Sequence, residues 1–113
     1  MTRKVVITGM GAVNGCGLTV AQTWDAIING RHGFAPITAF DTSNFLVKIA
    51  AEAKGFDPAA YMDAKDARRM DRYQQFAIAA SKEALAQSGL HITDENADRV
   101  AVMTARPGRI KTI

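Results

Sequence analysis

The sequence predicts an α/β fold, in which helices pack against a sheet. Two observations support this class. First, apolar segments follow one another in the order strand, helix, strand, helix, strand along the 113 residues, and this alternation is typical of layered α/β domains. Second, a long alanine-rich helix is apolar nearly all round at its centre, so it needs cover on several sides. Few other elements could cover it, which indicates that part of the fold is missing.

The first third of the chain is expected to hold a strand, a turn and a helix. Residues 3–8 are apolar and rich in β-branched side chains, which indicates a short strand closed by glycine. The glycine-rich turn Gly9–Gly17 follows. A helix is expected over Val20–Asn29, with Thr19 as its N-cap and Gly30 as its C-terminal stop. Its apolar stripe consists of Trp24, Ile27 and Ile28.

The rest of the chain holds the long helix between two further strands. Turn-forming residues indicate a loop over 31–46, and alternation predicts a strand over Val47–Ala53. Residues 55–64 are irregular, with one helical turn after Pro58. The long helix is expected over Lys65–Ser88 and ends at Gly89. One face of it carries Met70, Tyr73, Ala77, Ala80 and Ala84; a polar connection over residues 91–98 then leads to a last strand over 100–103.

Composition and charge exclude several classes of protein. The length allows one domain at most, spanning residues 1–113. No apolar run approaches the roughly 18 residues that span a bilayer, and the single cysteine fits a reducing compartment, so a cytoplasmic protein is expected. The net charge of +3 is mildly basic and falls short of a nucleic-acid-binding arm.

The glycine-rich turn has two interpretations. A strand, glycines and a helix in succession are the layout of a dinucleotide-binding unit. However, Asn14 stands where the third glycine of G-x-G-x-x-G is required, and no acidic residue ends a strand about 20 residues later. A tight structural turn is the better interpretation.

No residue is identified as catalytic, and none as a metal ligand. Cys16 could be a nucleophile, but no motif links it to His32 or His91. The three residues are interpreted as a structural thiol, a loop residue and a residue past a helix end. Their separation in sequence also lacks metal-ligand spacing.

Four cations share one side of the predicted long helix. Lys65, Arg68, Arg69 and Arg72 lie at positions i, i+3, i+4 and i+7, with Asp63, Asp66 and Asp71 among them. A solvated face with local ion pairs would explain this spacing. Cations near a helix N-terminus oppose the helix dipole, however, so an acidic partner is the alternative explanation.

The chain opens with Val5-Val6-Ile7-Thr8-Gly9-Met10-Gly11 and later carries two more specific blocks, Phe40-Asp41-Thr42-Ser43 and Arg68-Arg69-Met70-Asp71-Arg72-Tyr73. Over about residues 3–103 these segments together resemble the start of the β-ketoacyl-acyl-carrier-protein synthase II family, the 3-oxoacyl-acyl-carrier-protein synthases of bacterial fatty-acid synthesis. This resemblance implies an incomplete thiolase-like fold, in which the alanine-rich helix is a buried central helix. It also implies a homodimer in the parent enzyme.

The resemblance further implies a decarboxylative Claisen condensation between an acyl thioester and malonyl-acyl carrier protein, with no metal or organic cofactor. By the matching motif, Lys65, Arg68 and Arg69 would dock the acidic acyl carrier protein, with weaker support for Arg72. The cysteine and the two histidines that catalyse the reaction in this family lie beyond residue 113. The chain alone is therefore expected to be an inactive N-terminal fragment of an acyltransferase.

The sequence departs from the family where a glycine-rich loop should follow the last strand. Ala105-Arg106-Pro107-Gly108-Arg109 stands in its place, a pattern that a brief frame disturbance in the gene would produce. A second hypothesis remains open at this point. The chain could be a non-catalytic short protein that binds acyl carrier protein or a full-length synthase subunit.

Overall fold

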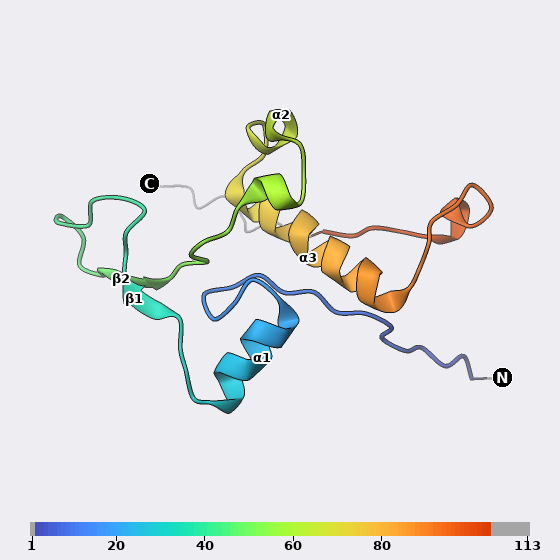
Figure 1. Cartoon of the computed structure of the whole chain (residues 1–113), viewed down its shortest axis with the longest axis horizontal. Helices are drawn as coiled ribbons and strands as arrows, with labels where there is room; N and C mark the ends of the chain where they lie inside the picture. The colour runs from blue at the N-terminus through green and yellow to red at the C-terminus, as the bar shows by residue number, and fades with distance from the viewer. Residues whose placement is uncertain (1, 105–113) are drawn as a thin grey trace.

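Two principal helices and one small strand pair make up the regular structure (Figure 1). The computed structural model describes residues 2–104. In chain order the elements are α1 (Val20–Ile28), β1 (Phe34–Pro36), β2 (Ile49–Ala51), the 3₁₀ turn η1 (Pro58–Ala60), α2 (Ala64–Ala67), α3 (Arg72–Ser88) and the 3₁₀ turn η2 (Ala97–Arg99). Strands β1 and β2 are antiparallel, with Ala35 opposite Ala50. Within residues 2–104 no helix is long and apolar enough to cross a membrane.

Helix α1 begins and ends where its capping residues predict. The Thr19 hydroxyl accepts a hydrogen bond from the Gln22 amide at 3.2 Å, which satisfies one of the free N–H groups of the first turn. Gly30 has a φ of +64°, and the Arg31 amide after it reaches back to the Ala26 carbonyl at 2.8 Å. The expected apolar stripe, by contrast, faces outward: Trp24 is 62% exposed, whereas Ala26 is buried.

The prediction of one continuous helix over Lys65–Ser88 is wrong, because a turn separates α2 from α3. Helix α2 ends in 3₁₀-type hydrogen bonds, in which the Arg69 amide donates to the Asp66 carbonyl and the Met70 amide donates to the Ala67 carbonyl. Asp71 then starts a new helix: its amide donates to Oε1 of Gln74 at 2.8 Å, one half of a capping box. Gly89, with a φ of +66°, ends α3 as expected.

The N-terminal segment crosses α3 at its small residues (Figure 1). A Cβ placed on Gly11 would lie 2.6 Å from the carbonyl carbon of Ala80, and one on Gly9 would lie 3.0 Å from that of Ala84. Ala80 and Ala84 belong to the face that periodicity assigns to packing. In the described part of α3, Gln75 and Ala79 are buried. Enclosure of the helix on several sides therefore stays a prediction.

Both outer strands predicted from the sequence are absent from the described residues. Residues 3–8 and 100–103 carry neither helix nor strand, and Val5 and Val102 are 93% and 80% exposed. Strand propensity measures how well a side chain fits a pleated, half-buried surface, and here no neighbouring strand supplies that surface. The observed sheet is instead the β1–β2 pair. β1 lies inside the predicted loop 31–46, and β2 is shorter than the predicted strand.

The described chain buries few large side chains. Its buried hydrophobic residues are Ala26, Phe56 and Ala79. The Cα radius of gyration is 17.4 Å, compared with about 13 Å for a compact domain of some 100 residues. The elements are thus held together by scattered contacts, many of them with α3, rather than by one central core.

Candidate functional site

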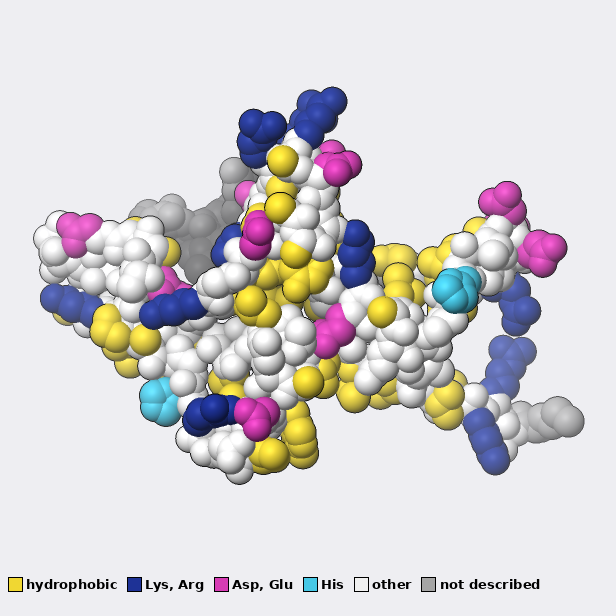
Figure 2. All heavy atoms as spheres, in the orientation of Figure 1, with side chains coloured by type: hydrophobic (Ala, Val, Ile, Leu, Met, Phe, Trp, Pro, Cys, Tyr) yellow, Lys and Arg dark blue, Asp and Glu magenta, His cyan; other side chains and the backbone are white. Residues whose placement is uncertain are grey.

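Three exposed cations lie on and directly after the short helix α2. Lys65 is within α2, Arg68 is its C-cap residue, and Arg69 follows in the turn that leads to α3. Figure 2 shows lysine and arginine side chains projecting from the end of the molecule that α2 occupies in Figure 1. We refer to Lys65, Arg68 and Arg69 as the cationic edge.

The carboxylates near the cationic edge do not pair with it. Among residues 2–104, the ion pair that forms joins Arg31 to Asp25 at the end of α1. Arg68 donates from Nε to the carbonyl of Ala64 at 3.2 Å, a contact within its own helical turn. The local ion pairs that a solvated face would form with Asp63, Asp66 and Asp71 are thus not made in the described structure. Among residues 2–104, the three cations thus form no ion pair, and Arg68 bonds only to a backbone carbonyl of its own helical turn.

Arg72 does not belong to this edge, although its spacing in the sequence suggests that it does. The turn between α2 and α3 places it at the start of α3. Its guanidinium carbon lies 4.9 Å from the ring centre of Phe56 and 5.1 Å from that of Phe76. Such stacking is favourable because the ring face is electronegative. The guanidinium also donates to the Phe56 carbonyl at 3.5 Å, so its interactions serve packing.

An aromatic cluster joins the segment before α2 to α3. Phe56 is only 6% exposed, and it packs edge-on against Phe76 at 4.9 Å and stacks with Tyr61 at 5.4 Å. Lys82 of α3 donates to the Tyr61 carbonyl. These contacts hold the segment that precedes α2, and with it the start of the cationic edge, against α3.

A buried glutamine holds the far end of α2. Gln75 is 8% exposed, and its Nε2 donates to the carbonyl of Ala67 at 2.8 Å and to that of Met70 at 3.4 Å. Its Oε1 is buried without a hydrogen-bond partner among the described residues. The burial and the contacts of Gln75 were not predicted from the sequence, because a polar residue in a helical pattern is assigned to the exposed face.

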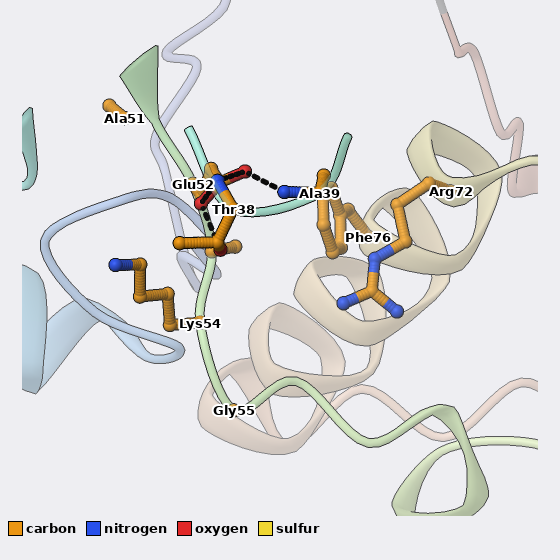
Figure 3. Close-up of a pocket in the computed structure, with 9 residues that line it drawn as sticks. Thr38, Ala39, Ala51, Glu52, Lys54, Gly55, Arg72 and Phe76 are labelled. Carbon is orange, nitrogen blue, oxygen red and sulfur yellow. Dashed lines mark hydrogen bonds between the residues drawn. The ribbon is translucent and has the colours of Figure 1, made fainter. Parts of the chain in front are cut away.

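An open hollow of about 490 Å³ lies between the β2 end and the start of α3 (Figure 3). On one wall the Glu52 carboxylate accepts bonds from the Thr38 hydroxyl at 2.8 Å and from the Ala39 amide at 3.0 Å. The bond from the Thr38 side chain is the main reason that the pKa of Glu52 lies below its usual value. The opposite wall holds Phe76 and the guanidinium of Arg72. Because Glu52 is already satisfied, this wall stabilises the hairpin rather than offering a free base.

Cys16 and His32 line the same hollow of about 400 Å³, although no motif linked them. The chain brings them together because Gly33 packs directly on Gly15; a Cβ on Gly33 would lie 2.8 Å from the Gly15 Cα. In the sequence, only the glycines next to Cys16 and His32 indicated that the two segments could approach each other closely. In the described residues no hydrogen bond joins the thiol to the imidazole, and no group of three potential ligands could hold a metal ion. His91 lies elsewhere, beyond the end of α3.

The glycine-rich turn has no place for a nucleotide phosphate. In dinucleotide-binding folds the helix N-terminus after the turn binds the phosphate. Here the Glu83 carboxylate occupies that position, because its oxygens accept the Val20 amide at 2.9 Å and the Ala12 amide at 3.0 Å. Gly9 and Gly11 instead permit the close approach to α3. The tight turn expected from the sequence lies at its end, where Asn14 and Gly17 exchange backbone bonds of 2.9 and 3.3 Å.

Comparison with known proteins shows the class of protein to which this chain belongs. Residues 2–108 match the family model described as beta-ketoacyl synthase, N-terminal domain. The chain therefore belongs to the β-ketoacyl synthase family. The altered segment Ala105–Arg109 overlaps the end of that match and lies outside the described residues.

The individual relatives are 3-oxoacyl-[acyl-carrier-protein] synthases by name. The chain is 47% identical over 100 residues to the 3-oxoacyl-[acyl-carrier-protein] synthase 2 of Vibrio cholerae and 48% identical to that of Vibrio harveyi. Each match covers 88% of this chain and 24% of the relative, so the chain spans about a quarter of their length. Among solved structures, the ishigamide ketosynthase/chain length factor superposes with a TM-score of 0.67 at 34% identity, over 76% of this chain and 21% of that one.

Proposed function

We propose that this chain is the N-terminal part of a 3-oxoacyl-[acyl-carrier-protein] synthase. The family match over residues 2–108 and the identity of 47% to a relative of that name support this assignment. The parent enzyme would transfer an acyl group to a cysteine, decarboxylate malonyl-acyl carrier protein and join the resulting carbanion to the thioester, with loss of CO₂. By the resemblance to the family, the catalytic cysteine and two histidines of the parent enzyme would lie outside this chain, which would then contribute binding and structure rather than chemistry.

The contribution that we assign to the described residues is docking of the acidic acyl carrier protein at the cationic edge. The observation that carries this proposal is the set of three exposed cations, Lys65, Arg68 and Arg69, which lack ion pairs within the described structure. Like charges held close together repel one another, and an acidic surface would relieve that repulsion. Rim charges of this kind chiefly accelerate association and make binding sensitive to salt.

The test is reversal of the cationic edge, Lys65→Glu, Arg68→Glu and Arg69→Glu together. Binding of a purified bacterial acyl carrier protein would be measured by isothermal titration calorimetry at low and high salt. A matched control reverses Arg3, Lys4 and Arg99, which are also exposed but lie outside α2. Both variants change the net charge from +3 to −3, since each reversal removes two charges.

We expect the edge variant to lose binding at low salt by roughly tenfold or more, and the control to keep most of it. Equal losses in the two variants would mean that net charge alone attracts the carrier, and the docking assignment would then fail. A separate assay addresses the chemistry. Acyl- and malonyl-acyl carrier protein incubated with the chain alone should yield no condensation product, whereas product formation would contradict the placement of the catalytic residues beyond it.

A further inference from the structure

We infer that Gln75 is a positioning residue for the cationic edge, and this rests on the docking function proposed above. Its side chain sets where Arg68 and Arg69 stand, although Gln75 itself is buried and faces no partner. Three observations on α2, on Gln75 and on its unpaired oxygen lead to this inference.

Helix α2 cannot hold its own position. It has four residues, Ala64–Ala67, and helices this short are unstable in isolation. The direction in which its side chains project therefore depends on contacts with the rest of the chain. Among residues 2–104, the side-chain hydrogen bonds that join the body of α3 to α2 and its following turn are those from Gln75.

The two carbonyls that Gln75 binds flank the two arginines of the cationic edge in sequence. Ala67 precedes Arg68, and Met70 follows Arg69. One side-chain amide thus donates hydrogen bonds to the backbone on both sides of the two arginines. Loss of either bond would remove an anchor between α3 and the peptide units of Arg68 and Arg69, which would then be held only by backbone bonds within α2 and its turn. The segment before α2 would stay fixed by the aromatic cluster around Phe56.

Filling of space in the interior does not account for a glutamine at this place. Gln75 is 8% exposed, and its Oε1 has no partner among the described residues. A buried acceptor without a donor is unfavourable, so an apolar residue of similar length would avoid that cost. Methionine has nearly the same length and similar helix propensity. What methionine cannot do is donate to the two carbonyls, and that is the function we assign to Gln75.

The experiment compares Gln75→Met with Gln87→Met. Gln87 provides a matched control, because it lies on the same helix and also makes one tertiary hydrogen bond, from the Met10 amide at 2.6 Å, far along the sequence from α2. Each variant is made in the natural chain and in a background with Arg68→Ala and Arg69→Ala. Binding of the same acyl carrier protein is then measured over a range of salt concentrations.

If Gln75 positions the edge, Gln75→Met weakens carrier binding roughly three- to tenfold and flattens its salt dependence, while Gln87→Met changes it less than about twofold. In the background without the two arginines, Gln75→Met should have no further effect, because nothing remains to be positioned. A purely structural role predicts the same loss in both backgrounds, and that result, or no loss at all, would overturn the inference.

Two safeguards keep the test decisive. Gln75→Asn keeps the amide but is one methylene too short to reach both carbonyls, so it should weaken binding like Gln75→Met. If circular dichroism shows one variant to be unfolded, the other decides. Charge reversal at Lys65, Arg68 and Arg69 distinguishes failure of the docking proposal from failure of the positioning role. If the reversal leaves carrier binding unchanged, the docking proposal fails. If the reversal weakens binding but the Gln75 variants do not, only the positioning role of Gln75 is refuted.

Discussion

The close approach of the N-terminal segment to α3 predicts that Gly11→Ala strongly destabilises the chain. The added Cβ would lie 2.6 Å from the Ala80 carbonyl carbon, about 1 Å inside the normal separation of two carbon atoms. The obstructing atoms belong to the helix backbone, which its own hydrogen bonds hold in place, so the N-terminal segment has to move. That movement also disturbs the bond from the Ala12 amide to Glu83.

The magnitude follows from three contributions. Overpacking costs about 1–3 kcal/mol, and a strained or lost hydrogen bond to a charged group costs about 1.5–3 kcal/mol. Alanine also lowers the conformational entropy of the unfolded chain, which offsets about 0.4–1 kcal/mol of this loss of stability. A net loss of about 2–3 kcal/mol is expected when the contributions overlap. With a urea dependence of about 1–3 kcal/mol per molar, the unfolding midpoint should fall by roughly 1–2 M.

The assay is urea unfolding followed by far-ultraviolet circular dichroism, with two companion variants. Gly30→Ala meets no atom within 4 Å and has a φ of +64°, so it should cost only the strain of that conformation, about 1–2 kcal/mol. Ala80→Gly should not rescue Gly11→Ala, since the obstruction is backbone. A loss below about 0.5 kcal/mol for Gly11→Ala, or a rescue by Ala80→Gly, would refute the close approach.

Two further predictions concern carboxylates. Glu83→Gln removes the charge that accepts the Ala12 and Val20 amides; it should lower the free energy of unfolding by about 1–2 kcal/mol in the same assay, and no change would mean that the charge does not cap α1. Thr38→Val removes the hydroxyl that lowers the pKa of Glu52. The pKa of Glu52, measured by NMR, should therefore rise toward the usual value of 4.5. Because the pKa of Glu52 is lower in the folded chain, the ionised carboxylate stabilises the β1–β2 pair above the unfolded-state pKa, and this stabilisation is lost as the pH falls through the folded-state pKa. Thr38→Val should therefore make the stability of the β1–β2 pair less sensitive to acid. An unchanged pKa of Glu52 in this variant would mean that another group lowers it.

Local sequence signals predicted the helices and their ends well. Thr19 and Gly30 delimit α1, and Gly89 ends α3, because capping depends on a few neighbouring atoms that the sequence names directly. The small face of α3 was also predictable, since Ala80 and Ala84 share one side. The break at Asp71 was not predicted: its capping signal with Gln74 stood inside an unbroken apolar pattern, which periodicity extends through the turn.

The strands and the site show where such reasoning fails. A strand requires a partner, and residues 3–8 have none in the described structure, so β-branched composition alone misplaced them. For the site, spacing on one imagined helix grouped Arg72 with the other cations, whereas the turn assigns it to the aromatic cluster. The part played by Gln75 depends on tertiary contacts with Ala67 and Met70, which no helical pattern encodes.

The contacts of the N-terminal segment also determine the order in which the chain can fold during synthesis. Met10 and Ala12 bond to Gln87 and Glu83, which lie 77 and 71 residues later. At roughly 5–20 residues per second, a ribosome needs about 4–15 s to add that length. Throughout this interval the segment that carries Gly9 and Gly11 has been synthesised, while the part of α3 that it packs against has not. The first residues to be synthesised are thus among the last to reach their native partners.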